Sequence, residues 1–397
     1  MDEHDHRVIG NRLDLFHQQE EGPGMVFWHP NGFAVYRAIE DYIRRLMREA
    51  GFREIRTPQL LARSLWEASG HWEKFGDDMF VFADGERVFA LKPMSCPGHI
   101  QIFNKRIRSF RDLPLRFCEF GACHRYEASG ALQGLMRTRA FVQDDAHIFC
   151  TEAQIEAEVA RFCTLLRGAY EDFGFPEFTI GFSTRPAIRA GSDALWDRAE
   201  AALEAAGRAA GLALRPLPGE GTFYGPKLDF TLRDRAGRDW QCGTIQLDFV
   251  LPERLAAEYT DARGERVRPV LIHHAVLGSV ERFLGMLLEH YRGSLPLWLA
   301  PEQVMVASIS ERQADYAGRV ASAFEAQDLR VRIDAGPDRL ARKVGAAHAA
   351  GIPILAAVGP QEERSGTVSL RRRDGSRTTL AVDSAASLLR EDVDRRR

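Results

Sequence analysis

Polar residues that could take part in chemistry alternate along a predicted strand at 138–149. In an extended segment, every second side chain points to the same side. One face carries three polar residues between two aromatic ones: Phe141, Gln143, Asp145, His147 and Phe149. Burying amide and carboxylate groups without partners is costly. The face is therefore either an exposed surface or part of a site. The periodicity leaves both open, because the opposite face carries Asp144.

Cysteine and histidine residues elsewhere could form a metal site with His147. Cys96 lies in KPMSCPGH, and His273 lies in LIHHAVLG. One thiolate and two imidazoles could bind zinc and leave a fourth position open for water or substrate, as in catalytic zinc sites. The spacing is far too long for a local finger motif, so the residues alone leave three competing ligands open: His99, His124 and His274.

Three arginines stand where predicted elements begin or end. Arg125 ends one predicted strand, Arg137 precedes the next, and Arg282 follows Gly278-Ser279 at the start of a predicted helix. Arginines in such positions can hold phosphate groups through paired hydrogen bonds. The alternative is that they form surface salt bridges, as most arginines do. The chain has neither a GxGxxG nor a Walker loop, so the two usual phosphate-binding loops are absent.

The elements that must position these residues alternate between helices and strands. Residues 31–50 have the apolar spacing of an amphipathic helix and are followed by a strand-like segment that ends at Pro58. Four further strands are predicted, at 115–125, 138–149, 227–234 and 240–250, and a helix is predicted at 278–291. Strands joined by hairpins indicate an antiparallel sheet with helices packed on it. The fold class predicted for this part is therefore α+β.

The C-terminal part has a different pattern. A Pro- and Gly-containing linker at 293–301 separates it from the rest, so we predict domains at 1–298 and 299–397. Strands and helices alternate in the second, with strands at 304–309, 329–334 and 353–359, helices at 315–324 and 338–350, and a hairpin at 369–382. This alternation predicts a small three-layer α/β domain.

Composition limits the class of protein. The 397 residues include 53 Lys and Arg against 56 Asp and Glu, a net charge of −3, and 45% are hydrophobic. These values exclude a disordered chain, a collagen and a coiled-coil rod, and they argue against a basic nucleic-acid-binding surface over the whole molecule. We see no apolar signal segment or membrane span, and six cysteines are too sparse for a disulfide framework. We therefore expect a cytoplasmic protein without a membrane partner.

Several segments together resemble the class II aminoacyl-tRNA synthetases. The helix and strand ending at Pro58 resemble motif 1, LRFCEFGACHRYEASGALQGLMRTRAF resembles motif 2, and GSVERFLGMLLEHY resembles motif 3. Within that class, the amino-acid sequence is similar to that of the threonyl-tRNA synthetase family from about Asp5 to the C-terminus. The segments that carry this closer resemblance are KPMSCPGH, FVQDDAHIFC, GEGTFYGPKLDF, QCGTIQLDF and IHHAVLGSVERF. The resemblance covers the family's catalytic core and anticodon-binding domain, without its N-terminal editing region.

The resemblance implies a role for each matching residue. Cys96, His147 and His273 match the ligands of one zinc ion per subunit, which would bind the amino group and hydroxyl of threonine. The implied threonine pocket is formed by Met94, Gln143, Asp145, Tyr224 and Gln246. The implied ATP contacts are Arg125, Glu127, Arg137, Phe141, Gln241 and Arg282. Lys227 matches a residue near the reacting carboxylate, and His71 matches one near the terminal ribose of tRNA. Glu362 and Arg371 match anticodon contacts.

The implied activity is ATP-dependent activation of L-threonine and its transfer to threonine tRNA, with Mg²⁺ accompanying ATP and a homodimer built through the motif 1 surface. One feature of the sequence complicates the implied site. Gln241 and Gln246 are five residues apart, so they can share a face of one strand only if the strand contains a bulge.

Some residues differ from those that the family usually has, and these differences keep two alternative functions open. Residues 336–341 read GPDRLA where the family typically has Arg-Asn-Glu-Lys-Ile-Gly, and Ala350 and Gly351 stand where it usually has basic or polar residues. These changes motivate a second hypothesis, a synthetase-like enzyme that passes threonine or a relative to a non-tRNA acceptor such as a carrier protein. A third hypothesis is a non-catalytic binding paralogue. Every matched catalytic position is intact, which argues against this hypothesis.

Overall fold

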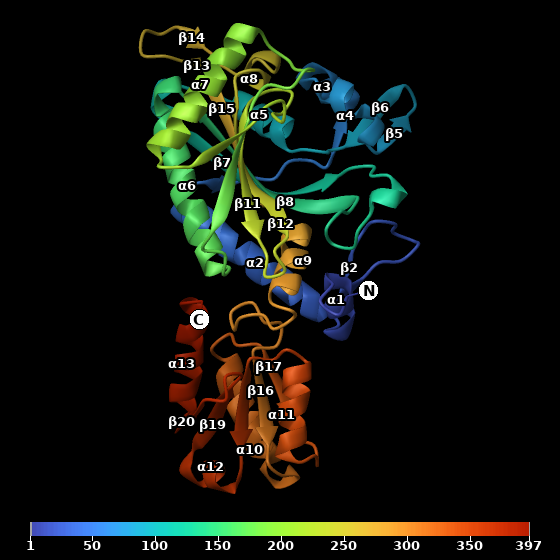
Figure 1. The fold of residues 1–397 in the computed structure, drawn as a ribbon, viewed down its shortest axis with the longest axis vertical. Coiled ribbons are helices and arrows are strands. Elements are labelled where there is room, and N and C mark those ends of the chain that lie inside the picture. The colour runs from blue at the N-terminus through green and yellow to red at the C-terminus, as the bar shows by residue number, and fades with distance from the viewer. Residues whose placement is uncertain (1, 397) are drawn as a thin grey trace. The chain divides into compact units, whose positions relative to one another are not determined.

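The computed structural model describes residues 2–396, which form two compact units (Figure 1). The larger unit contains Gln18–Val26 and Glu40–Phe283. The smaller contains the described residues before Gln18, the segment Phe27–Ile39 and the described residues from Leu284 onward. Helices α2 (Pro30–Glu49) and α9 (Val280–His290) contribute to both units. The domain boundary expected between 298 and 299 stays a prediction.

The larger unit is organised around one eight-stranded sheet. Its six central strands are antiparallel, and the strand at each edge is parallel to its neighbour. In spatial order the strands are β10 (Leu214–Leu217), β9 (Phe178–Ser183), β11 (Lys227–Arg233), β12 (Asp239–Asp248), β15 (Val270–Ser279), β8 (Ala140–Cys150), β7 (Leu115–His124) and β3 (Arg53–Glu54). The predicted α+β class with an antiparallel sheet is confirmed.

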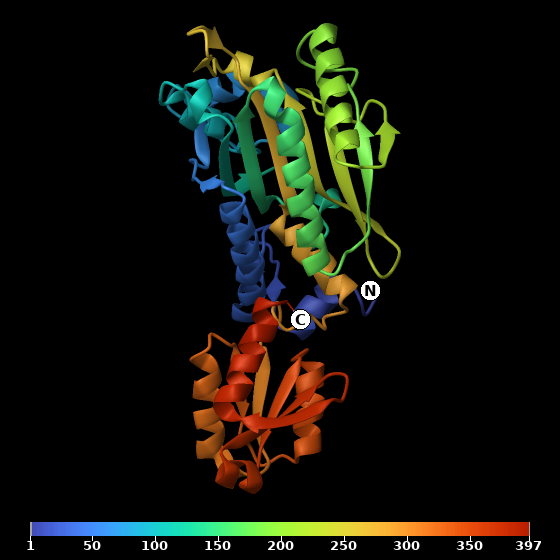
Figure 2. The same ribbon diagram turned by 90° about the vertical axis from the view of Figure 1, so that its left-hand side faces the viewer.

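Helices cover both faces of this sheet, which explains why the central strands are buried along most of their length. Helices α6 (Ile155–Asp172) and α7 (Asp193–Ala209) lie along one face, where Figure 2 shows them in green. On the opposite face, α5 (Cys96–Asn104) and α8 (Leu251–Arg254) pack against the sheet through an apolar cluster that includes Phe103, Phe149 and Leu271. Polar residues on that face are therefore enclosed rather than solvated.

Two strands of the sheet are irregular. Between β11 and β12, Asp229 pairs with Thr244 but Thr231 pairs with Gln241, so β12 contains a bulge. This bulge is the one that Gln241 and Gln246 require in order to share a face. In β15, two additional residues separate the pairings of Ala275 and Ser279 with β8.

Most predicted elements appear within a few residues of their expected bounds, but the segment before Pro58 is different. The predicted strand there is wrong beyond Arg53–Glu54, because only those two residues pair, with Phe117 and Cys118 of β7. The helix expected from 278 begins at Val280. Gly278 has a φ of +82°, and the following residue still pairs with β8, so the chain is not yet helical there.

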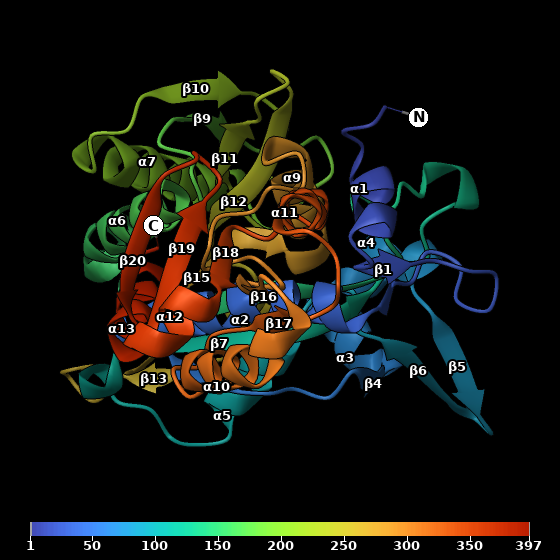
Figure 3. The ribbon, with the colours of Figure 1, turned by 90° about the horizontal axis from the view of Figure 1, so that it is seen from below.

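The C-terminal part of the smaller unit has the predicted three layers (Figure 3). Its five strands lie in the order β17 (Val331–Asp334), β16 (Val304–Ser308), β18 (Ile354–Val358), β19 (Thr367–Arg372) and β20 (Arg377–Ala381). One face packs against α10 (Ala314–Glu325) and α13 (Val382–Asp394), and the other packs against α11 (Leu340–Ala349). Helices α12 (Pro360–Ser365) and α13 were not predicted.

The remaining elements are short. They are α1 (His6–Arg12), β1 (Phe16–His17), β2 (Phe27–Trp28), β4 (Leu60–Ala62), α3 (Arg63–Ser69), α4 (His71–Phe75), β5 (Val81–Asp84), β6 (Arg87–Leu91), β13 (Tyr259–Thr260) and β14 (Arg266–Val267). All six cysteines are free thiols, as their sparse spacing predicted. Within residues 2–396, no helix combines the length and apolarity that crossing a membrane requires.

Candidate active site

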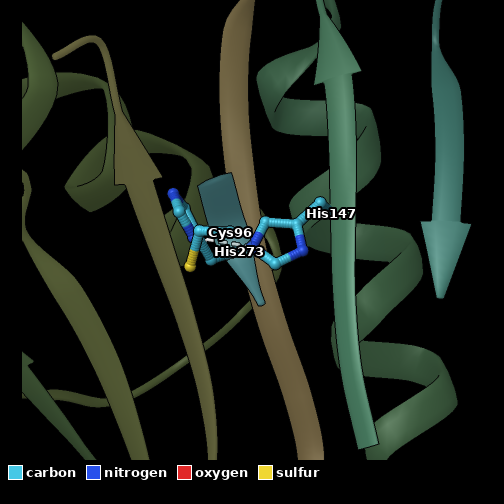
Figure 4. A group of neighbouring side chains, drawn as sticks. All are labelled: Cys96, His147 and His273. Carbon is cyan, nitrogen blue, oxygen red and sulfur yellow. Dashed lines mark hydrogen bonds between the residues drawn. The ribbon is translucent and has the colours of Figure 1, made fainter. Parts of the chain in front are cut away.

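A cysteine and two histidines meet on the enclosed face of the large sheet (Figure 4). His147 in β8 and His273 in β15 are direct register partners, and Cys96 is the first residue of α5, which covers them. Their ligand atoms all lie within 4.8 Å of one another. His147 Nε2 is 2.9 Å from His273 Nδ1, and all three residues are buried. Strand pairing and the start of one helix thus bring together residues 177 positions apart.

A hydrogen-bond partner lies behind each of the two histidines. His273 Nε2 is 2.9 Å from Asp248 Oδ2. His147 Nδ1 is 2.9 Å from His99 Nδ1, and His99 Nε2 is 3.1 Å from Glu119 Oε2. A carboxylate can only accept, so Nε2 of His273 and Nε2 of His99 carry the protons. His99 Nδ1 then accepts from His147 Nδ1.

These tautomers make the cluster suitable for a cation. They leave lone pairs on His147 Nε2 and His273 Nδ1, the two nitrogens that face each other and the thiol of Cys96. Burial holds the pKa of His147 well below its usual range, and a proton on His99 or His273 would lower it further, so the His147 imidazole is neutral. Burial raises the pKa of the Cys96 thiol, so a bound metal would displace its proton. A thiol that binds as the thiolate, two oriented imidazoles and the carboxylates of Asp248 and Glu119 behind them form a donor set that fits zinc.

The three competing histidines have other positions. His99 lies behind His147, where its two ring nitrogens connect His147 to Glu119 through hydrogen bonds. His274 points to the opposite face, where it packs against Phe162 at a ring distance of 4.5 Å. His124 ends β7, and its ring lies 6.4 Å from that of Phe80. The alternation of strand side chains separates His273 from His274, a distinction that spacing alone could not make.

Glu119 is held by a buried ion pair next to the cluster. Lys92 Nζ donates to Glu119 Oε1 at 2.9 Å, and the amide and hydroxyl of Thr57 donate to the same carboxylate at 2.8 Å each. Burial raises the pKa of Glu119, but the hydrogen bonds from His99 and Thr57 and the charge of Lys92 lower it to about 2. The carboxylate therefore stays charged and keeps His99 oriented.

The residues expected to form a threonine pocket surround this cluster. Gln246 pairs in register with His273, and Tyr224 stacks on the His273 ring with 4.8 Å between centroids. The Tyr224 hydroxyl donates to Gln246 Oε1 at 2.5 Å. Asp145 Oδ1 lies 3.9 Å from His147 Nδ1. Met94 packs against the apolar cluster that contains Cys96. Of the five expected residues, only Gln143 instead lines the adjoining pocket described next.

A pocket of about 420 Å³ adjoins the cluster and contains the residues expected to contact ATP. It is lined by Arg125, Glu127, Leu135, Met136, Arg137, Thr138, Phe141, Gln143, Gln241, Cys242, Thr244, Gly278, Ser279 and Arg282. All six residues expected to contact ATP are in this lining. Three arginines and one aromatic ring are a combination that suits a base and a row of phosphates.

Local contacts hold these side chains in place. The Arg125 guanidinium lies 5.1 Å from the centre of the Phe141 ring and donates to the carbonyl of Pro93 at 3.3 Å. Arg137 pairs with Glu127 at 2.7 Å. The Arg282 amide donates to Ser279 Oγ at 3.2 Å, which fixes the first turn of α9. The three arginines thus approach the same pocket from the end of β7, from the segment before β8 and from α9.

Lys227 begins β11, and His71 is the first residue of α4. Lys227 Nζ forms an ion pair with Asp229 at 2.9 Å, and Asp229 also accepts from Gln241 and Ser183. His71 is fully buried, and its Nδ1 lies 2.8 Å from Ser69 Oγ. Among the described residues, no hydrogen-bond partner reaches His71 Nε2. Burial, together with the charges of His273, Arg254 and Arg125, lowers the pKa of His71 to about 3.

The two residues expected to contact an anticodon are in the other unit. Glu362 Oε2 accepts from the Gly359 amide at 3.0 Å at the start of α12. Arg371 lies in β19, where it pairs in register with Leu355 and Arg377. The structure places both in the C-terminal three-layer part.

The sequence analysis missed Lys92, Glu119 and Asp248, which support the cluster. Glu119 had a signal, because it is the only charged residue on an otherwise apolar strand face that includes Phe117 and Cys123. Asp248 had none, since it ends a strand in which polar residues alternate anyway.

Both parts of the chain match known protein families. Residues 80–291 match the tRNA synthetase class II core domain (G, H, P, S and T), and residues 303–392 match an anticodon binding domain. A threonine–tRNA ligase of Caulobacter vibrioides is 55% identical over 392 residues, which are 98% of this chain and 60% of the relative. One from Methylococcus capsulatus is 56% identical over 371 residues. The chain spans about 60% of the length of these curated relatives.

Two solved structures have the same fold over nearly the whole chain. The structure titled as the RNA binding domain of threonyl-tRNA synthetase from Cryptosporidium parvum has a TM-score of 0.95 at 40% identity and covers 98% of both chains. A putative threonyl-tRNA synthetase from Aeropyrum pernix has a TM-score of 0.87 at 29% identity, with 99% of this chain and 96% of that one covered.

Proposed function

This chain belongs to the threonyl-tRNA synthetase family of the class II aminoacyl-tRNA synthetases, and on that premise we propose that it activates L-threonine with ATP and transfers it to threonine tRNA. The observation that carries this proposal is the juxtaposition of the donor set Cys96, His147 and His273 with an arginine-lined pocket on one face of one sheet. The donor set fits a small amino acid that is recognised through a bound metal, and the arginine-lined pocket fits a nucleoside triphosphate.

Cys96, His147 and His273 would hold one zinc ion per subunit. When bound, zinc supplies an open, Lewis-acidic position that can take the amino group and hydroxyl of threonine. Valine has nearly the same shape as threonine but lacks the hydroxyl. Shape alone discriminates weakly between such substrates, whereas leaving a site built for a hydroxyl unpaired costs far more. Asp145, beside His147, is suited to accept a hydrogen bond from the same hydroxyl.

The neighbouring residues would orient ATP for attack. Phe141 is suited to stack on adenine, Arg125 to bind the α-phosphate and Arg282 the γ-phosphate, with Mg²⁺ accompanying the nucleotide. The threonine carboxylate then attacks the α-phosphorus in line, a P–O bond to the β-phosphate breaks, and pyrophosphate leaves. Lys227 would stay near the reacting carboxylate. The step needs no nucleophile from the protein, so the Cys96 thiol is free to act as a ligand.

In the second step, a hydroxyl of the 3′-terminal ribose of tRNA attacks the carbonyl carbon of threonyl-adenylate, and AMP leaves. His71 is a candidate for accepting the hydroxyl proton at Nε2, because no hydrogen-bond partner among the described residues occupies that nitrogen. Glu362 and Arg371 would contact the anticodon. We also propose a homodimer formed through the motif 1 surface, action in the cytoplasm, and a division into domains near residue 298.

Threonine-dependent exchange of pyrophosphate into ATP tests the activation step. We expect exchange with threonine, weaker exchange with serine, which keeps the hydroxyl, and exchange with valine reduced by at least about a hundredfold. Equal exchange with valine and threonine would contradict recognition of the hydroxyl. No exchange with any of the three would contradict the proposed function.

A further inference from the structure

Two irregularities divide the large sheet into halves next to the active site. On one side, β12, β15 and β8 pair regularly, and this half carries Gln246, His273 and His147 opposite one another. On the other side lie the bulge of β12, after Gln241, and the irregular segment of β15 that ends at Ser279. The regular half thus contains the two histidines of the Cys-His-His cluster, and the irregular half contains residues of the nucleotide pocket.

A tyrosine from α6 bridges the two irregular strands. The Tyr170 hydroxyl donates to the carbonyl of Val276 in β15 at 2.9 Å and accepts from the amide of Gly243 in β12 at 2.8 Å. Tyr170 is fully buried. A Cβ at Gly243 would lie 2.6 Å from the hydroxyl oxygen, so the glycine is needed for this approach. Burial holds the pKa of Tyr170 well above its usual value, which keeps the hydroxyl protonated as a donor.

An aspartate in β8 replaces the pairing that β15 loses. The buried Asp144 carboxylate accepts from three consecutive amides, those of Val276 and Leu277 at 2.8 and 2.9 Å and that of Gly278 at 2.9 Å. These amides lie within the interval where the register of β15 against β8 is shifted. Buried backbone donors must find partners, and here one side chain satisfies all three.

We propose that Tyr170 and Asp144 are positioning residues for the nucleotide: from the face opposite the pocket, they fix the two irregular strand segments and thereby the placement of Gln241 and Arg282. The proposal rests on the proposed function, because it assigns the pocket to ATP. Neither side chain is in the pocket lining. Their effect passes through the backbone of Gly243 and of 276–278, and then through Ser279, whose hydroxyl accepts from the Arg282 amide.

The proposal predicts that ATP binding weakens while threonine binding does not, a difference that a general loss of packing would not produce. Loss of the Tyr170 hydroxyl leaves a buried amide and a buried carbonyl unpaired at the bulges, and the strands there should relax toward new partners. That movement shifts the nucleotide half of the site. The regular pairing of Gln246, His273 and His147 does not depend on either group, so threonine binding should be nearly unaffected.

The test compares Tyr170→Phe with the wild-type chain. Affinity for Mg-ATP is measured by titration calorimetry, and KM for ATP and for threonine is measured by pyrophosphate exchange. We expect ATP affinity to fall about tenfold, a loss of ~1.4 kcal/mol, while KM for threonine stays within about twofold. Asp144→Asn should produce the same split. Hydrogen exchange of peptides covering 241–246 and 274–280 should accelerate in both variants.

Tyr316→Phe is the matched control. Its buried ring lies in the C-terminal three-layer part, and its hydroxyl donates to the Thr367 carbonyl at 2.7 Å. It should lower thermal stability through the loss of that one buried hydrogen bond and leave both KM values unchanged. Unchanged ATP affinity in Tyr170→Phe, or an equal rise in both KM values, would overturn the proposal.

The outcomes also separate this proposal from the proposed function. If the wild-type chain binds Mg-ATP but shows no threonine-dependent exchange, the proposed function fails, and the ATP titration of Tyr170→Phe still decides whether the positioning role holds. If the wild-type chain does not bind Mg-ATP, both proposals fall.

Discussion

Replacing Asp248 with asparagine should weaken metal binding by changing which nitrogen of His273 carries the proton. Asp248 Oδ1 accepts from the amides of Val250 and Leu251 at 2.7 and 3.0 Å, and Oδ2 faces His273 Nε2 at 2.9 Å. In Asp248→Asn, the one amide oxygen must stay with the two backbone donors. The NH₂ group then faces Nε2, forces it to accept, and moves the imidazole proton to Nδ1, the nitrogen that faces the cluster.

The size of the effect follows from the position of this group. Changes in the partners behind metal-binding histidines typically cost about 10- to 100-fold in metal affinity, or ~1.4–2.7 kcal/mol. The exchange of aspartate for asparagine is nearly isosteric, so the fold should persist. We therefore expect the zinc dissociation constant to rise by about 10- to 100-fold, with a parallel rise in KM for threonine and little change in KM for ATP.

Competition with a chelator measures the zinc affinity, and the visible absorption of the cobalt-substituted protein reports the ligand geometry. Asp261→Asn is a suitable control. Its carboxylate also accepts from two backbone amides, those of Arg263 and Glu265 at 2.9 Å each, but it lies in the turn between β13 and β14. Zinc affinity in Asp248→Asn equal to that of the wild type and the control would refute the tautomer argument.

Three further substitutions test other parts of the site. Cys96→Ala should remove zinc from the purified protein, as measured by elemental analysis, and full retention would refute the ligand assignment. Arg282→Ala should raise KM for ATP in the exchange assay by about 10- to 100-fold through loss of a charged hydrogen bond, and KM for threonine should not follow it. Glu119→Gln should lower the unfolding free energy at pH 6, where the Glu119 carboxylate is charged. The pKa of that carboxylate is lowered from 4.5 to about 2, so its contribution of roughly 3 kcal/mol is present above pH 4.5 and is lost as the pH falls toward about 2. Urea unfolding at several pH values measures this, and a wild-type-to-variant difference that does not change with pH would contradict it.

The strand period was enough to predict which residues of 138–149 share a face, because a side-chain period of two does not depend on the rest of the fold. The requirement for a bulge between Gln241 and Gln246 followed from the same rule, and the structure contains that bulge. The antiparallel sheet and the three-layer C-terminal part also followed from local patterns, since burial of one face per element dictates them.

Choosing among the histidines needed more than the pattern. His273 and His274 are adjacent, and only the register of β15 against β8 decides which one faces Cys96. The resemblance to a family supplied that choice before the structure did. Partners that come from distant elements, such as Asp248 behind His273 and Tyr170 behind the bulges, left no local trace in the sequence.

Short elements were also hard to predict, because pairing with neighbouring segments rather than local propensity determines them. The segment before Pro58 forms only a two-residue strand, and α12 has six residues between a glycine at each end.

Charging of a transcribed threonine tRNA by the purified chain tests the central claim most directly. The claim is that the Cys-His-His cluster and the arginine-lined pocket together load threonine onto the 3′-terminal ribose of that tRNA. We predict that labelled threonine becomes attached through a base-labile ester, that attachment requires ATP, and that it is lost in the Cys96→Ala variant. We also predict that charging weakens as salt is raised, because phosphate contacts contribute to tRNA binding. Robust threonine-dependent pyrophosphate exchange without any charging of the tRNA would contradict the claim.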